Sequence, residues 1–263
     1  NHHTQIIAIT DNIIPHEKRF FDTPFSKYFL PVLDGAVAMS RKVLKDLQDF
    51  PLSKPVAKTG YHAHPLYDNF GHFVSKSEAC KVLGLDVNKR YILFFGFIRN
   101  YKGLDLLLDA MALLPESLQD VNLLVAGEYY EDSAPYDEII ARKQLENRIE
   151  LHTKFIPNDD VRLYFSAADI VAQPYRNATQ SGVSQIAYHF ETPMIITNVG
   201  GLSELVPHGE AGWVCEPTAE SLAEAVVSMY EPGRIEHVRT SLKELKKQFS
   251  WPSMVKALEE VTS

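Results

Sequence analysis

The sequence has 263 residues, 45% hydrophobic and 23% charged, which is the composition of a soluble globular protein of one large or two ordinary domains. Its formal net charge of −8, with no dominant stripe of lysine and arginine, argues against nucleic acid as a partner. Cys80 and Cys215 are the only cysteines, which excludes a disulfide framework and favours a reducing, cytoplasmic compartment. No apolar run reaches the length of a membrane span.

The first part of the chain predicts three strands and one helix. The strand patterns cover residues 5–9, 34–39 and 56–61. Ser40 is expected to cap a helix that reaches about residue 48. Three strands are too few for a domain that would match the one that follows. Residues 1–72 are therefore expected to be the remnant of a larger domain, with exposed apolar surface or a partner over it.

A polar loop containing His16 follows the first predicted strand. Ligands bind at the carboxyl ends of the strands in open α/β sheets, so this loop is a candidate site. A histidine there can act as acid or base, which makes His16 a catalytic candidate. An exposed histidine without a role is an equally open interpretation.

From residue 73 onward, strand and helix patterns alternate regularly. The strands are expected at residues 91–95, 121–126, 149–152, 169–172, 194–197 and 212–215. The helices are expected at residues 76–83, 104–114, 136–146, 159–167, 181–190, 219–230 and 235–249, with one more from Trp251. Such alternation predicts a doubly wound parallel sheet covered on both faces. Residues 73–232 are expected to form one complete domain, and residues 233–263 to be helices that pack across the domain junction.

A run of small polar residues separates the strand at 169–172 from the helix at 181–190. The free N–H groups and the dipole at a helix start favour an anion, and a small residue such as Gly182 lets a ligand approach the backbone. A phosphate is the expected anion at Ser181 and Gly182. A polar helix cap without a ligand is the alternative, and these residues alone do not decide between the two.

The loop after the strand at 91–95 carries two cations, Arg99 and Lys102, between two glycines. Arginine can grip phosphate oxygens in a bidentate manner and lysine adds a point charge, so the loop is a second candidate phosphate contact. An ordinary solvated loop is the alternative.

A third loop, residues 198–204, follows the strand at 194–197 and contains paired glycines that allow close backbone approach. Glu204 could accept from a ligand hydroxyl or cap the next short helix, and the structural interpretation is slightly favoured.

No metal or cofactor site is predicted. His62 and His64 are two residues apart without a cysteine or acidic ligand nearby, which is poor spacing for zinc. No Gly-x-Gly-x-x-Gly follows any predicted strand, which weighs against a nicotinamide or flavin site.

These motifs occur in one order along the chain, at residues 94–103, 123–128, 168–175, 179–182, 192–206 and 209–212. As a set they resemble the large family of retaining GT-B glycosyltransferases, which includes many bacterial sugar and mannosyl transferases. Members of that family have two Rossmann-like domains. The second holds the nucleotide-sugar donor, and the first binds the acceptor.

The resemblance implies a set of donor contacts. The expected donor-binding residues are Arg99, Lys102, Phe155, Ile156, Gln180, Ser181, Gly182, Val183, Gln185 and Glu204. Arg99 and Lys102 would grip the diphosphate and stabilise the charge that develops on the leaving nucleotide. Phe155 and Ile156 lie on the loop that holds the base in the family, and Gln185 would meet the ribose.

The chain departs from the family in two respects. Most members carry two carboxylates across the sugar and ribose sites, and neither is present here, where Thr179 and Ile186 stand at the two positions. Thr179, Gln180 or Ser181 would then meet the sugar, and the catalytic candidates are His16 and Thr179. The first strands and the acceptor-side glycine loop of the first domain are also absent, so a chain of this extent is expected to bind the donor with little or no transfer.

The resemblance implies an α/β protein of GT-B type, with two Rossmann-like doubly wound parallel-sheet domains of which the first is incomplete. Its activity would be that of a retaining glycosyltransferase, moving a hexose from a nucleoside-diphosphate sugar to a saccharide or lipid-linked acceptor in the cytoplasm, without a metal. Peripheral membrane contact through the absent part of the first domain is left open. Two alternatives also stay open: a non-catalytic nucleotide-sugar-binding protein, because both carboxylates are missing, and a nucleotide-sugar epimerase of the same architecture. The cationic loop and residues 200–204 favour the transferase.

Overall fold

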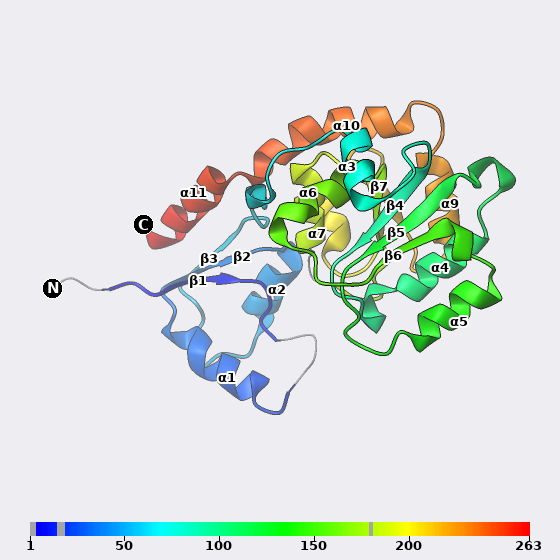
Figure 1. Ribbon diagram of the computed structural model, residues 1–263. Helices are drawn as coiled ribbons and strands as arrows, with labels where there is room; N and C mark the ends of the chain where they lie inside the picture. Colours follow the sequence, from blue (N-terminus) through cyan, green and yellow to red (C-terminus); the bar gives the residue numbers. More distant parts are fainter. Residues whose placement is uncertain (1–3, 15–18, 179–180) are drawn as a thin grey trace. The chain divides into compact units, whose positions relative to one another are not determined.

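The computed structural model describes residues 4–14, 19–178 and 181–263 (Figure 1). The chain divides into two compact units, of which the first comprises Asn1–Leu66 and Lys247–Ser263 and the second Tyr67–Lys246. The two C-terminal helices therefore fall in different units. The boundaries expected after residues 72 and 232 remain predictions, as does packing of these helices across the junction.

The first unit is built on a parallel sheet in the order β1-β2-β3. Its strands are β1 (Ile7–Thr10), β2 (Gly35–Ala38) and β3 (Lys58–Tyr61). Its helices are α1 (Asp22–Phe29), the short 3-10 helix η1 (Leu30–Val32), α2 (Arg41–Asp49), the 3-10 helix η6 (Lys246–Phe249), which begins at the boundary, and α11 (Trp251–Thr262). The three strands overlap the predicted ones. Ser40 caps α2 as predicted, since its Oγ accepts from the Val43 N–H at 3.0 Å.

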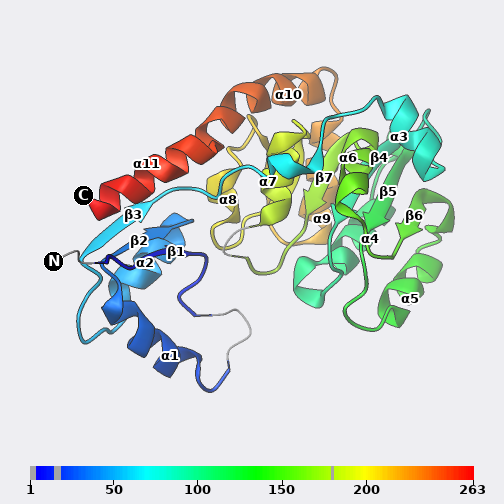
Figure 2. The ribbon, with the colours of Figure 1, turned by 60° about the vertical axis from the view of Figure 1, so that its left-hand side comes forward.

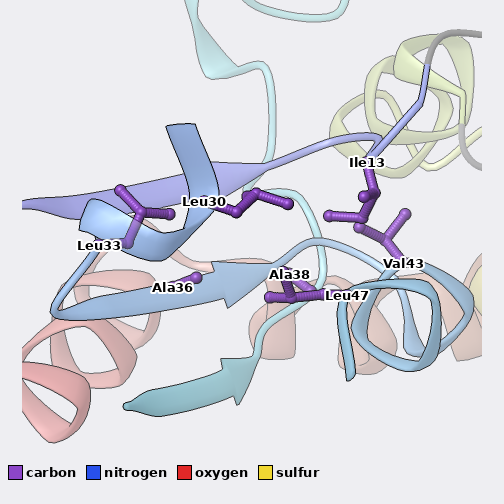
Figure 3. Packing of buried hydrophobic residues seen from close by; sticks show 7 residues of the cluster. All are labelled: Ile13, Leu30, Leu33, Ala36, Ala38, Val43 and Leu47. Atoms are coloured by element: carbon purple, nitrogen blue, oxygen red, sulfur yellow. The ribbon is translucent and has the colours of Figure 1, made fainter. Parts of the chain in front are cut away.

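Side chains of β2 alternate between the two faces of this sheet, so the strand contributes to two separate apolar cores. One core contains Ile13, Leu30, Leu33, Ala36, Ala38, Val43 and Leu47 (Figure 3). The other contains Val37, Met39, Met254 and Val261. Helix α2 and η1 supply the first core, and α11 supplies the second.

Helix α1 is the element that the sequence patterns did not predict. None of its residues is buried, although Phe21, Phe25, Tyr28 and Phe29 recur with a helical period, so its apolar stripe is exposed. Phe25 and Tyr28 are 68% and 79% exposed, and Phe20 just before the helix is 90% exposed. The exposed apolar surface predicted for the first unit is therefore present, and it is centred on α1.

The second unit contains a six-stranded parallel sheet in the order β6-β5-β4-β7-β8-β9. Its strands are β4 (Arg90–Phe95), β5 (Val121–Ala126), β6 (Ile149–His152), β7 (Ile170–Gln173), β8 (Met194–Thr197) and β9 (Gly212–Cys215). Each begins and ends within one residue of its predicted position. Every residue of β5, β7 and β8 is buried, which is why these strands are continuous apolar runs in the sequence.

Helices cover both faces of this sheet. They are α3 (Lys76–Leu83), α4 (Leu104–Ala112), α5 (Ala134–Arg142), α6 (Asn158–Ala167), α7 (Gly182–His189), α8 (Leu202–Leu205), α9 (Ala219–Met229) and α10 (Arg234–Leu245). Helix α4 packs against α5 and α9, whereas α3 packs against α6, and the two groups lie on opposite faces of the sheet (Figures 1 and 2). Within the described ranges, no helix is both long and apolar enough to cross a bilayer.

Candidate functional site

The centre of the six-stranded sheet is the point where the order of the strands reverses. Strand β4 comes first, β5 and β6 lie on one side of it, and β7, β8 and β9 lie on the other. At such a switch point the loops after the two central strands run in opposite directions and open a crevice in which ligands bind. The loops concerned here follow β4 and β7. They carry Lys102 and Ser181 respectively.

The loops after β4 and β7 pack directly against each other. The backbone N–H of Arg176 donates to the Tyr101 carbonyl at 2.7 Å, and its Nη1 donates to Oδ1 of Asp105 at 2.8 Å. Gly103 has φ +70°, and a Cβ at this position would lie 2.0 Å from the Pro174 carbonyl oxygen. Because only glycine tolerates both conditions, Gly103 sets how closely the two loops approach.

Lys102 is partly buried between these loops. Its Nζ lies 5.9 Å from the centroid of the Tyr175 ring, and the Tyr175 hydroxyl lies 3.3 Å from Oγ of Ser181. Burial, with a smaller contribution from Arg99, lowers the pKa of Lys102 to about 8. None of the described carboxylates forms an ion pair with Lys102. A desolvated cation without a counter-charge is stabilised when an anion binds, so this position favours an anionic ligand.

Arg99 lies on the same loop, near Lys102. Its guanidinium carbon is 3.8 Å from the centroid of the Tyr130 ring, which is a cation–π contact. The N–H of Tyr130 donates to the Ile98 carbonyl at 3.0 Å, so the loops after β4 and β5 are joined there. The two cations are close enough for the charge of Arg99 to depress the pKa of Lys102.

The start of α7 is both capped and closely covered. Oγ of Ser181 accepts from the Val183 N–H at 3.2 Å, so the polar-cap interpretation of this stretch is realised. A Cβ at Gly182 would lie 3.0 Å from Cε2 of Tyr67, so this ring covers the first residue of the helix. The N–H of Val183 is already hydrogen-bonded to Ser181. An anion here would therefore interact with the dipole of α7 rather than with the Val183 N–H.

Gln185 is fully buried, because α7 is buried along residues 183–188. Neither amide atom of Gln185 has a hydrogen-bond partner among the described residues. Beside it in the sequence, Oγ of Ser184 donates to Oε1 of Gln173 at 3.1 Å, and Nε2 of Gln173 is also without a partner. A buried unpaired polar group costs about 1–3 kcal/mol, so these two amides are retained at a cost in stability. A role for Gln185 at the ribose stays a prediction.

A small apolar hollow of about 130 Å³ adjoins the loop after β4. Phe155 and Ile156 line it together with Phe95, Phe97 and Gly127. The Phe97 and Phe155 side chains are 50% and 65% exposed. Exposed aromatic rings beside an apolar hollow suit a flat ring such as a nucleobase.

The remaining predicted residues contribute less to this geometry. Glu204 is exposed in the first turn of α8. His16, Thr179 and Gln180 lie outside the described residues, so their roles stay predictions. In the part of the chain that the structure describes, no group of histidine, cysteine and acidic side chains could hold a metal ion.

Two tyrosines that join the parts of this site were not identified from the sequence. Tyr175 connects Lys102 to Ser181, and burial raises the pKa of its hydroxyl far above the usual value. Tyr130 forms the cation–π contact with Arg99. Their only signal in the sequence is their position in the loop that follows a strand.

Comparison with known proteins agrees with the motif order. The family model described as glycosyl transferases group 1 matches residues 89–232, more than half of the chain. The chain therefore belongs to the glycosyl transferases group 1 family, and the resemblance drawn from its motifs is confirmed.

Among curated proteins, the chain is similar to the D-inositol 3-phosphate glycosyltransferase of Jonesia denitrificans, with 30% identity over 177 residues, 64% of this chain and 42% of the relative. It is also similar to the lipopolysaccharide core biosynthesis mannosyltransferase LpsB of Rhizobium meliloti, with 30% identity over 194 residues, 71% of this chain and 52% of the relative. The chain thus spans about half the length of the curated relatives it matches.

Among solved structures, the fold is similar to that of HepE from Anabaena in complex with UDP-glucose. The TM-score is 0.81 at 19% identity, and the match covers 98% of this chain and 72% of HepE. The predicted fold class, α/β of GT-B type, is confirmed.

Proposed function

We propose that the chain binds a nucleoside-diphosphate sugar at the carboxyl edge of the six-stranded sheet, for transfer of a hexose to an acceptor hydroxyl with retention of configuration. The observation that carries the proposal is Lys102, a partly buried cation with a pKa of about 8 beside the loop that leads into α7. Membership of the family supports sugar transfer, and the UDP-glucose bound by HepE supports a nucleotide sugar as the donor.

The charges fit the chemistry of the reaction. Transfer breaks the bond between the anomeric carbon and the diphosphate, so negative charge grows on the leaving nucleotide. Lys102 and Arg99 supply fixed positive charge for it, and the dipole at the start of α7 adds to their field. Removing one such preorganised group typically costs about 3–4 kcal/mol of transition-state stabilisation.

The hollow beside Phe155 would take the base. It adjoins Gly96, and a Cβ at Gly96 would lie 3.1 Å from Nζ of Lys102, so the hollow and the cation are adjacent. A nucleoside diphosphate could therefore place its ring between Phe97 and Phe155 and its diphosphate at Lys102. UDP is the first nucleotide to try, because it is the one in the HepE complex.

Calorimetric titration with UDP, GDP and ADP tests binding. We expect one of them to bind with a dissociation constant in the micromolar to millimolar range, about −8 to −4 kcal/mol. Arg99→Ala and Lys102→Ala should each weaken binding, and Lys81→Ala, which removes an exposed lysine of α3, should not. Nucleotide binding that is unchanged in both Arg99→Ala and Lys102→Ala would rule out the proposed phosphate site.

A second function, nucleotide-sugar binding without turnover, is favoured by one observation. Helix α7, Gly182–His189, carries no carboxylate, and its amide Gln185 is buried. Incubation with a radiolabelled donor separates the two, because an enzyme releases or transfers label and a binding protein does neither. Analysis of the recovered nucleotide sugar for an epimerised hexose tests the remaining alternative, a nucleotide-sugar epimerase.

A further inference from the structure

A basic pocket lies in the same unit, away from the carboxyl edge of the six-stranded sheet where the donor is proposed to bind. That edge, with the loops that carry Lys102 and Ser181, is called the donor edge below. Its volume is about 420 Å³, and its walls come from α10, from the end of α7 and from the segment that precedes α3. Helix α10 contributes Arg239, Lys243 and Lys246, the last of them just past its end. The spacing of four and three residues places all three on one face of the helix.

Two of these cations have no counter-charge among the described residues. The side chains of Arg239 and Lys243 form neither a hydrogen bond nor an ion pair with any of them. Lys246 does have a partner, since its Nζ lies 2.6 Å from Oε1 of Glu191. Three cations therefore face one carboxylate along the pocket wall, in a chain whose net charge is −8. Positive charge concentrated in a hollow of an acidic protein selects anions locally.

The pocket also offers apolar surface and a fixed floor. Phe73 is 55% exposed on its wall, and Phe190 is buried beneath it. Nε2–H of His189 donates to the Gly71 carbonyl at 2.8 Å, which ties the end of α7 to the segment before α3. A ligand with a small organic part could therefore pack on Phe73 while its anionic group meets α10.

This pocket and the donor edge lie at opposite ends of α7. The helix begins at Gly182 on the donor edge and ends at His189 in the pocket wall. Eight residues of α-helix span roughly 12 Å, so one phosphate cannot occupy both places.

We propose that this pocket is a second anion site, which binds a phosphate monoester through Arg239 and Lys243 with its organic part on Phe73. A dianionic phosphate matches two unpaired cations better than a monoanion does. The C-terminal ends of α7 and α10 carry negative partial charge, which favours the nearby cations Lys243 and Lys246 but does not explain Arg239 in the middle of α10.

Phenyl phosphate is a suitable probe, because it combines a phosphate monoester with one apolar ring. Calorimetric titration of the full chain should show binding, and phenyl sulfate, which carries a single charge, should bind more weakly. Arg239→Gln and Lys243→Gln should each weaken phenyl phosphate binding roughly tenfold, the size of one charge-assisted hydrogen bond. Lys81→Gln, an exposed lysine of α3 outside the pocket, is the matched control and should have no effect.

Glu191→Gln gives a change of the opposite sign. It releases Lys246 from its ion pair, so phenyl phosphate should bind severalfold more tightly. A purely structural role of this cluster would instead lower the melting temperature without tightening binding. Melting curves of all variants show whether each remains folded.

The donor site is controlled for separately. Lys102→Ala should weaken UDP binding and leave the phenyl phosphate site intact, whereas Arg239→Gln should do the reverse, so either proposal can fail alone. Sedimentation with phosphatidylcholine vesicles containing phosphatidic acid distinguishes a lipid headgroup from a free phosphate ester, since both present the same group. The second site is overturned if the chain binds neither probe. It is also overturned if Arg239→Gln, Lys243→Gln and Glu191→Gln all bind phenyl phosphate with the wild-type affinity.

Discussion

The two units use similar short parallel strands but cover them to very different extents. In the second unit, three of the six strands are buried at every residue, and the aromatic side chains Phe94 and Phe165 are at most 1% exposed. In the first unit only β2 is buried throughout, and Phe20 and Phe25 are 90% and 68% exposed. Because apolar side chains stabilise a fold through the surface that they remove from water, we expect those of the second unit to contribute far more to stability than Phe20 and Phe25 do.

The donor edge is an exception within the well-covered unit. Among the described residues, Lys102 is partly buried there without a carboxylate partner, both amide atoms of Gln185 lack a hydrogen-bond partner, and so does Nε2 of Gln173. These are features that cost stability in the empty protein, and such costs collect where a ligand is to be bound. The molecule therefore contains a covered core in the second unit, exposed apolar surface in the first unit, and a site that lowers stability at the edge of the core.

The largest expected effect is a difference between the two units in how much the loss of an aromatic side chain lowers the free energy of unfolding. Phe94→Ala should lower the free energy of unfolding by about 3–5 kcal/mol, because it leaves a cavity in a closed core. Phe25→Ala should change it by less than about 0.5 kcal/mol, because the ring is exposed.

Each unit has its own fluorescent probe for this measurement. The two tryptophans are Trp213, in β9 of the second unit, and Trp251, in α11 of the first. Urea titrations in the Trp251→Phe and Trp213→Phe backgrounds therefore report the second and first units separately. Equal losses for Phe94→Ala and Phe25→Ala would mean that burial does not distinguish the units.

The next largest effect concerns the contact between the two donor loops. Gly103→Ala should destabilise the second unit by about 3 kcal/mol, because the new Cβ would lie 2.0 Å from the Pro174 carbonyl oxygen. Gly84→Ala is the matched control, since Gly84 has a similar φ of +73° and nothing within 4 Å of a Cβ. The control should cost only the backbone strain, about 1–2 kcal/mol. Equal costs for the two variants would show that the loops can move apart.

Most of the second unit could be predicted from the sequence. Its strands are buried on both faces, so each is an unbroken apolar run between polar loops, as in residues 121–126. Helix α1 was not predicted, although Phe21, Phe25, Tyr28 and Phe29 recur with a helical period, so the signal for it is present in the sequence.

Prediction of the site was less complete. Arg99 and Lys102 could be proposed from the sequence, because cations in a loop after a strand are conspicuous, and their role at the donor stays a prediction. Tyr175 could not, since its role depends on which loops the fold brings together rather than on its neighbours in the chain. The burial of Gln185 also follows from packing around α7, which a local pattern does not contain.

Lys102→Met tests whether the buried charge of Lys102 favours nucleotide binding and lowers the stability of the empty protein. The variant should bind the nucleotide diphosphate at least tenfold more weakly, because a charge-assisted contact worth about 1.5–3 kcal/mol is lost. It should also raise the melting temperature, because a desolvated charge is replaced by an apolar side chain of similar length. Lys81→Met, on the exposed surface of α3, should change neither quantity. A melting temperature that falls in Lys102→Met would show that the lysine stabilises the empty protein.

The most gradual effect is a pH dependence with opposite signs for binding and stability. The pKa of Lys102 is lowered from 10.5 to about 8 in the folded chain, so its proton is lost as the pH rises through 8. Binding of the nucleotide diphosphate needs the charged form and should weaken progressively above pH 8, until the higher pKa of the bound state is passed. Stability should change the other way, because between pH 8 and 10.5 the unfolded chain holds this proton and the folded chain does not. The contribution of Lys102 to the free energy of unfolding, taken as wild type minus Lys102→Met, should therefore rise across that window. Lys102→Arg keeps its charge and should bind with a flat profile from pH 7 to 10. A wild-type profile equally flat over this range would show that Lys102 keeps its ordinary pKa, and that the donor edge carries no buried charge to distinguish it from the covered core.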